Sequence, residues 1–405
     1  MKWRICPLLI CLICSCVTQN GDDWPMFQHD PQHIGFSGSS MPFPLREAWV
    51  HKGMGRYGVF VVSDERLFIP CESVMSCIDI KDGSVWWNTD LGRKVLLWSI
   101  PAATSKRVFV GGMGAVFCFD ADTGELAWKK EEEYVDFYSP PIVIGQLVII
   151  GSGKPLKLEA TESAKKVMCL DAETGEVIWD FYASDLTAFS PSYYESRIFV
   201  NAGRFFYCLD VQTGDVIWER EIEQMSFSGL SLDEERILVG ISDGIACLDM
   251  EAGDLLWHFK CGEMVFRCPA TAYDKVFFGT PDGIFYCLDA KKGELFWRTE
   301  IGSVISTEAV IADEKVAFGT VDGTLYIMDT ESGEVCESID LGENQITSLA
   351  LTNGKLIAGL WDGTVICFEG SPFWKTTPVA IGSAAIISFL IFFWYYRRRS
   401  LRSGQ

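Results

Sequence analysis

The feature that most constrains this chain is a nine-residue pattern, Asp-x-x-x-Gly-x-x-x-Trp, that returns about every 40 residues. Six copies end in tryptophan and a seventh ends in Glu337; they occupy 79–87, 120–128, 171–179, 210–218, 249–257, 289–297 and 329–337. Successive tryptophans of the six copies are 41, 51, 39, 39 and 40 residues apart. This period is typical of a four-stranded β-propeller blade and is too long for most helical solenoids.

The sixth unit shows how one repeat divides into strands. Period-2 alternation and turn residues predict strands at 275–279, 284–289 and 294–297, with a further strand around 266–271. The turns 280–283 and 290–293 each end in glycine. Runs with a helical period are absent between residues 22 and 370, so we predict an all-β domain.

The two ends of the repeat region set the number of blades. Seven units contain all four strands, whereas the eighth, 354–369, stops before its tryptophan strand. A matching strand, Glu47-Ala-Trp49, lies 38 residues before Trp87. We therefore predict an eight-bladed β-propeller over 46–370 in which the N-terminal strand closes the last blade, because closure removes exposed sheet edges.

The start of the chain resembles a secretory signal peptide. Lys2 and Arg4 precede about 13 mostly apolar residues, which predicts a leader over 1–18 and an N-terminal arm over 19–45. The run Ile13-Cys14-Ser15-Cys16 also loosely resembles a lipobox. Either Cys16 carries a lipid or ordinary cleavage occurs nearby.

The other end predicts a membrane anchor. Residues 378–396 contain no charge and are long enough to span a bilayer, with aromatic residues near both ends. Arg397, Arg398 and Arg399 follow directly, so the positive-inside rule makes 397–405 a cytoplasmic tail and places the propeller outside. The linker between the two is 371–377. A buried core helix is the alternative reading of the apolar segment.

Composition excludes several classes of protein. The formal net charge of -21 argues against a nucleic-acid-binding protein, which needs a basic surface for phosphates. A hydrophobic content of 48% argues against a disordered chain. The sequence contains no P-loop, nucleophile elbow or HExxH motif.

The repeated tryptophans and cysteines are predicted to be structural. The tryptophans should pack between adjacent blades; they are Trp49, Trp87, Trp128, Trp179, Trp218, Trp257 and Trp297. The cysteines at one repeat position should be buried thiols rather than a metal cluster, because the ring separates them; they are Cys77, Cys118, Cys169, Cys208, Cys247, Cys287 and Cys367. Cys261 and Cys268 are the one pair considered for a disulfide.

Two further patterns admit a metal as the alternative to a structural role. Each Asp-x-x-x-Gly run offers a single aspartate, which favours a hairpin turn over a calcium loop. His29-Asp30-x-x-His33 is interpreted as packing of the N-terminal arm.

A candidate binding face is expected where the loops between blades meet the channel. Residues before the innermost strands include five aromatics, Trp98, Tyr138, Phe189, Phe227 and Phe266, and the same loops hold Arg56, Arg93 and Arg267. A longer loop, 152–166, contributes Lys154, Lys157, Lys165 and Lys166, and Trp361 should be exposed on the same face. Aromatics with arginine suit a protein interface or a small anionic ligand. The alternatives are aromatics that plug the channel and a loop that is only a solvated insertion.

The repeat resembles the tryptophan-docking repeat of the pyrroloquinoline-quinone (PQQ) propellers, and 23–35 (DWPMFQHDPQHIG) resembles the N-terminal arm of PQQ-like repeat proteins on cell surfaces. The resemblance covers about 22–370. One branch of this family, the quinoprotein dehydrogenases, implies an enzyme with PQQ, calcium and usually an adjacent-cysteine disulfide. This chain has no adjacent cysteines and mostly short connections. It is more similar to the BamB branch of non-catalytic scaffolds, which implies no cofactor.

These observations together predict a membrane-anchored extracellular scaffold that is not an enzyme. It should bind an extracellular or envelope protein, or a small ligand, and should not bind nucleic acid. The alternatives are a PQQ-dependent oxidoreductase with calcium and an envelope assembly factor similar to BamB. The C-terminal anchor departs from the BamB branch, whose members are held by an N-terminal lipid.

Overall fold

The structure is a computed structural model that describes residues 23–52, 56, 59–92, 99–153, 165–185 and 189–371. The predicted leader, with Cys16, and the predicted span and tail lie outside these ranges. Within them, no helix is long and apolar enough to cross a bilayer.

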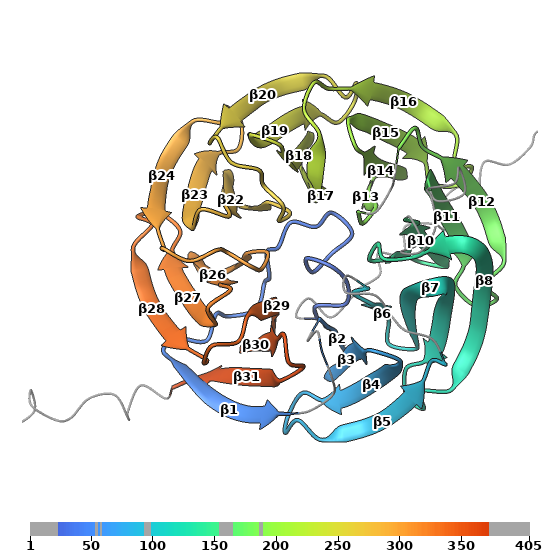
Figure 1. The fold of residues 1–405 in the computed structure, drawn as a ribbon, viewed down its shortest axis with the longest axis horizontal. Coiled ribbons are helices and arrows are strands. Elements are labelled where there is room, and N and C mark those ends of the chain that lie inside the picture. Colours follow the sequence, from blue (N-terminus) through green and yellow to red (C-terminus); the bar gives the residue numbers. More distant parts are fainter. Residues whose placement is uncertain are drawn as a thin grey trace, which may run out of the picture.

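The strands form eight antiparallel sheets arranged around a central channel, which confirms the predicted eight-bladed all-β propeller (Figure 1). Blade 1 contains β2 (Val61–Ser63), β3 (Arg66–Cys71), β4 (Val74–Asp79) and β5 (Val85–Asp90), and blade 2 contains β6 (Ala102–Ala103), β7 (Arg107–Asp120) and β8 (Leu126–Asp136). Blade 3 contains β9 (Ile142–Ile144), β10 (Leu147–Gly151), β11 (Lys166–Asp171) and β12 (Val177–Tyr182). Blade 4 contains β13 (Ser192–Tyr194), β14 (Arg197–Ala202), β15 (Phe205–Asp210) and β16 (Val216–Glu221).

Blade 5 contains β17 (Ser226–Asp233), β18 (Arg236–Ile241), β19 (Gly244–Asp249) and β20 (Leu255–Lys260), and blade 6 contains β21 (Ala270–Ala272), β22 (Lys275–Gly279), β23 (Ile284–Asp289) and β24 (Leu295–Glu300). Blade 7 contains β25 (Val310–Ala312), β26 (Lys315–Gly319), β27 (Thr324–Asp329) and β28 (Val335–Asp340). Blade 8 contains β29 (Ile346–Thr352), β30 (Lys355–Leu360) and β31 (Val365–Gly370), together with β1 (Leu45–His51). In blade 2 the single long strand β7 pairs with β6 through its first half and with β8 through its second half.

The ring closes as predicted, because β1 pairs with β31 to complete blade 8. Trp49 of β1 lies opposite Cys367 of β31, which repeats the Cys–Trp pairing found in six other blades, for example Cys77 opposite Trp87. The N-terminal and C-terminal strands of the domain therefore lie side by side at the seam (Figure 1).

Seven of the eight junctions between neighbouring blades contain one tryptophan each. Each indole Nε1–H donates a hydrogen bond to the carbonyl oxygen that follows the repeat's Asp in the next blade; Trp49 to Ile80 at 2.9 Å and Trp257 to Ala290 at 3.2 Å span the range. The ring also lies against the glycine of that turn. A Cβ on Gly124 would lie 2.5 Å from the Trp87 ring, and the φ of Gly124 is 72°, so glycine is required there twice over.

Glu337 replaces tryptophan at the junction where the ring closes. The next blade has no Asp-x-x-x-Gly turn there, since β31 is followed in space by β1 from the other end of the chain. A tryptophan would have no carbonyl or glycine of this kind to contact. Instead the Glu337 carboxylate accepts the backbone N–H of Leu45, with N–O distances of 3.0 and 3.2 Å.

The repeated aspartates act as turn formers. Asp171 Oδ1 accepts the backbone N–H groups of Glu173 and Thr174 at 3.0 and 2.8 Å, and these bonds lower the pKa of Asp171. Equivalent bonds are made by the aspartate of the other turns, for example Asp210 and Asp329. The sequence interpretation of these runs as structural turns agrees with this geometry.

The repeated cysteines are buried, as predicted, and burial raises the pKa of each thiol to about 12. Cys261 and Cys268, the pair considered for a disulfide, are both free thiols. The repeated cysteines therefore fill the core as free thiols instead of crosslinking it.

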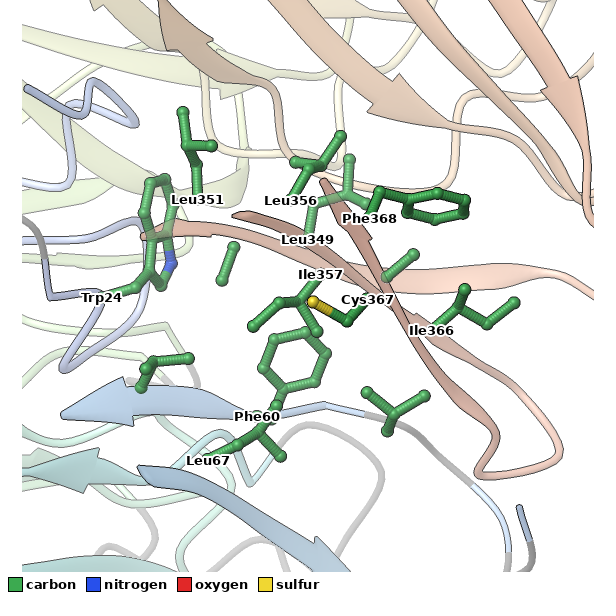
Figure 2. Packing of buried hydrophobic residues seen from close by; sticks show 14 of the residues in the cluster. Trp24, Phe60, Leu67, Leu349, Leu351, Leu356, Ile357, Ile366, Cys367 and Phe368 are labelled. Carbon is green, nitrogen blue, oxygen red and sulfur yellow. The ribbon is translucent and has the colours of Figure 1, made fainter. Parts of the chain in front are cut away.

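The N-terminal arm, residues 23–41, runs across the channel and joins most blades through their innermost strands (Figure 1). Backbone hydrogen bonds connect Trp24 to Val62 of blade 1, Pro25 to Ala103 of blade 2 and Gly35 to Ile311 of blade 7. Further bonds from the arm reach blades 4, 5 and 6 at Tyr193, Leu232 and Thr271. In Figure 2 the Trp24 indole lies near Leu351 in the apolar cluster that joins blade 8 to blade 1.

We call the face that carries the starts of the innermost strands and turns such as 280–283 the upper face. The lower face carries the ends of those strands and the Asp-x-x-x-Gly turns. The arm's bonds fall within the innermost strands, beyond the residues that precede those strands on the upper face, so the arm crosses the channel below that face.

Candidate functional site

The mouth of the channel on the upper face is a pocket of about 620 Å³. It lies within the range of small-molecule and peptide-binding pockets. Residues just before the innermost strands and in the upper turns line it, and Phe27 of the arm also lines it from within the channel.

Four consecutive blades each place one aromatic side chain in the pocket wall. These are Tyr138, Phe189, Phe227 and Phe266, from blades 3, 4, 5 and 6. The rings of Phe227 and Phe266 meet edge to face, with centroids 5.9 Å apart. Phe266 is 51% exposed, so this wall continues onto the open rim. All four were predicted from the sequence, because each lies just before or at the start of the innermost strand of its repeat.

The opposite wall is mostly aliphatic and includes one more exposed aromatic. Trp361, in the upper turn of blade 8, lines the pocket and is 38% exposed. Val304 and Val321 of blade 7 line it as well and are exposed by 42% and 43%. An apolar rim of this kind, next to polar surface, is typical of a binding site.

One ion pair lies in the wall of the pocket. Arg267 Nη1 is 3.7 Å from Glu308 Oε1, and the two side chains are 19% and 20% exposed. Arg267 was predicted from the sequence, whereas Glu308 was not. The sequence contains only a weak indication of Glu308, which is an acidic residue two positions before the apolar strand β25.

Below the pocket, the arm contributes polar groups that the sequence analysis also missed. A second cavity, of about 30 Å³, shares Phe27, Ile100 and Glu308 with the pocket and is also lined by Gln28. Gln28 is 4% exposed, and its Nε2 donates to the Cys268 carbonyl at 2.9 Å. Its Oε1 is buried and has no hydrogen-bond partner.

The two arm histidines serve packing. His33 is fully buried and contacts the Leu230 carbonyl at 3.2 Å and the Ser192 hydroxyl at 3.0 Å. Burial lowers the pKa of His33 to about 4, so the ring is neutral at physiological pH. The His29 ring lies edge-on to Trp24 with centroids 5.0 Å apart. Both positions agree with the interpretation of this motif as arm packing.

The remaining predicted residues that the structure describes do not line the pocket. Arg56 is exposed and outside the pocket lining. Lys166 is 7% exposed in β11, where its Nζ lies 3.2 Å from Asp180 and 3.6 Å from Glu132. Lys165 precedes that strand and does not line the pocket either. Arg93, Trp98, Lys154 and Lys157 lie outside the described residues.

A family model described as outer membrane protein assembly factor BamB matches residues 71–226 and 204–372. No curated protein sequence matches the chain at a significant level. The crystal structure of BamB from Moraxella catarrhalis is 17% identical, with a TM-score of 0.66, over 80% of this chain and 97% of that one.

Quinoprotein enzymes have the same fold. Quinohemoprotein alcohol dehydrogenase from Comamonas testosteroni is 15% identical, with a TM-score of 0.72, over 87% of this chain and 81% of that one. A europium-containing methanol dehydrogenase is 14% identical, with a TM-score of 0.70, over 84% of this chain and 89% of that one. At such identities the likeness establishes the fold alone.

The described pocket residues do not fit PQQ with calcium. PQQ carries three carboxylates, whereas the described lining contains a single cation, Arg267. Among the described residues, no group of three or more His, Cys, Asp or Glu side chains is placed to hold a metal ion. Calcium needs several oxygen ligands together.

Proposed function

Because this chain belongs to the PQQ-like β-propeller family represented by outer membrane protein assembly factor BamB, we propose that it is a non-catalytic binding scaffold. The observation that carries the proposal is the pocket at the channel mouth, whose aromatic wall continues onto an exposed apolar rim. Large aromatic side chains around a concave site supply most of the energy of protein interfaces. The partner is an extracellular or envelope protein that docks on the upper face.

The orientation of the chain ends supports a role at the cell surface. Strand β31 runs from the upper turn that holds Trp361 to Gly370 on the lower face, where the Ser371 N–H bonds to the Pro44 carbonyl at 2.8 Å. The predicted membrane span begins at Pro378. A seven-residue linker, 371–377, reaches at most about 25 Å. The lower face would then lie near the membrane, and the pocket would face outward.

The proposal is tested with crosslinking in native membranes. Phe266→Ser and Trp361→Ser should each reduce the crosslinked partner at least about fivefold, because they remove exposed apolar area at the rim. Phe296→Ser is the matched control, since Phe296 is 52% exposed on the outer strand β24, away from the pocket. An equal loss in the control, or no loss in the rim variants, would contradict the proposal.

The same crosslinked species identifies the kind of partner. A barrel-assembly component would favour an envelope assembly role, as the name of the family model suggests. The non-catalytic part of the proposal is tested separately by adding PQQ and Ca²⁺ during purification. Mass spectrometry should find no stoichiometric quinone; bound quinone with dye-linked alcohol or sugar oxidation would establish an enzyme instead.

A further inference from the structure

The part of the pocket that adjoins the small cavity offers hydrogen-bond acceptors for which the described residues supply no donor. The first is the Glu308 carboxylate, whose one charged neighbour is Arg267 at 3.7 Å, beyond hydrogen-bond length. The second is Gln28 Oε1, which is buried and unpartnered. Both residues line the small cavity that shares Phe27 and Ile100 with the pocket.

An acceptor that remains unpaired in a buried place, as Gln28 Oε1 does, costs free energy until a donor reaches it. The small cavity has room for about one water molecule, which can serve Gln28 in the free protein. A carboxylate has about four lone-pair positions, so Glu308 can accept bonds from a ligand while Arg267 stays beside it. This part of the site therefore favours a ligand that brings several N–H donors.

The walls above these acceptors favour a positive charge on that ligand. Aromatic faces attract cations, and Tyr138, Phe189, Phe227, Phe266 and Trp361 all line the same pocket. The net charge of -21 also attracts cations toward the protein at long range. The apolar rim then suits aliphatic or aromatic groups on either side of the cation.

We propose that the pocket takes a basic side chain, arginine or lysine, presented by an extended segment of the partner protein between large apolar residues. Its guanidinium or ammonium group donates to Glu308 and, directly or through a water, to Gln28. The proposal rests on the proposed function of the pocket and adds the chemistry that the pocket selects.

The test compares two peptides that differ only in charge. Acetyl-Phe-Arg-Phe-amide and acetyl-Phe-citrulline-Phe-amide have the same size, and citrulline is neutral. Calorimetry on the full chain in detergent should show the arginine peptide binding at least about tenfold more tightly. Glu308→Gln should abolish this preference, whereas Glu343→Gln should retain it, because Glu343 is exposed on the upper face outside the pocket lining.

A second variant guards against misfolding of Glu308→Gln, which removes the carboxylate beside Arg267. Gln28→Met keeps the length of the side chain, removes the amide acceptor and should weaken arginine-peptide binding about threefold or more. Equal binding of both peptides to the unaltered protein, or a preference that survives in Glu308→Gln, would overturn the inference. The crosslinking of rim variants would still decide the proposed function independently.

Agmatine, a free guanidinium amine, distinguishes the source of the cation. It should bind at least about tenfold more weakly than the arginine peptide, because it lacks the apolar neighbours that contact the rim. Binding of agmatine as tight as that of the peptide would overturn the assignment to a partner segment.

Discussion

The lower and upper faces of the ring use the same repeat in different ways. On the lower face, turn after turn has the same aspartate bonds, the same glycine and the same tryptophan docked on it. On the upper face, equivalent positions hold different residues: Tyr138 in blade 3, Phe266 in blade 6 and Ser306 in blade 7. The contacts that hold blades together therefore repeat the same residues, whereas the pocket varies the residue type around one repeated position.

The largest effect expected from this difference is on the free energy of unfolding, when a lower-face tryptophan and an upper-face tryptophan are each replaced. Trp218→Ala removes an 8% exposed ring and its bond to the Met250 carbonyl, and should lower the free energy of unfolding by about 3–5 kcal/mol. Trp361→Ala, at the pocket rim, should change it by about 1 kcal/mol or less. Denaturant unfolding measures both. Equal destabilisation by the two substitutions would contradict the division between the faces.

A smaller effect is the pH dependence of stability that comes from His33, in the arm that crosses the channel. Burial holds the pKa of His33 near 4, whereas in the unfolded chain it is 6.5. The unfolded chain therefore binds more protons between these values, and the free energy of unfolding falls as pH falls from about 6.5 to 4. The loss from His33 amounts to about 3 kcal/mol.

This pH dependence is measured as a difference between variants, since many carboxylates begin to titrate in the same range. His33→Asn should be less stable at pH 7 but should show a flatter dependence between pH 6.5 and 4. An unchanged slope in His33→Asn would mean that His33 is not the buried neutral group described here.

The smallest of these effects lies at the one lower-face junction without tryptophan. Glu337→Ala leaves the Leu45 N–H without its acceptor and should destabilise the domain by about 1–3 kcal/mol. Glu337→Gln keeps an acceptor and should lose less. Glu334→Ala is the control, because its side chain is exposed in the same blade. If Glu337→Ala matched that control in thermal unfolding, the contact would not stabilise the seam.

The repeat allowed the blade count, the closing strand and the aromatic pocket wall to be predicted from sequence, because each follows from one position taken around a ring. Glu308 and Gln28 could not be found in this way. They meet only because the arm crosses the channel beside blade 7, and no local pattern encodes that approach. Glu337 was visible as an exception, but its partner Leu45 is 292 residues away.

Lys166, in contrast, was predicted to lie on the binding face from the lysine-rich composition of its segment, and this prediction was wrong. The lysine-rich loop suggested an exposed binding surface, yet Lys166 begins strand β11 and lies among Glu132, Asp180 and the ring of Tyr182. The cation here neutralises two acidic neighbours within the fold. Charge pattern alone did not distinguish a solvated lysine from a paired one.

The central claim, that the partner docks at the channel mouth, is tested most directly by site-specific photocrosslinking at two positions of blade 6. Phe266 and Phe296 are almost equally exposed, at 51% and 52%, but only Phe266 lines the pocket. A photoreactive residue at 266 should capture a discrete partner in native membranes, and one at 296 should not. Capture at 296 alone, or equally at both positions, would contradict the account.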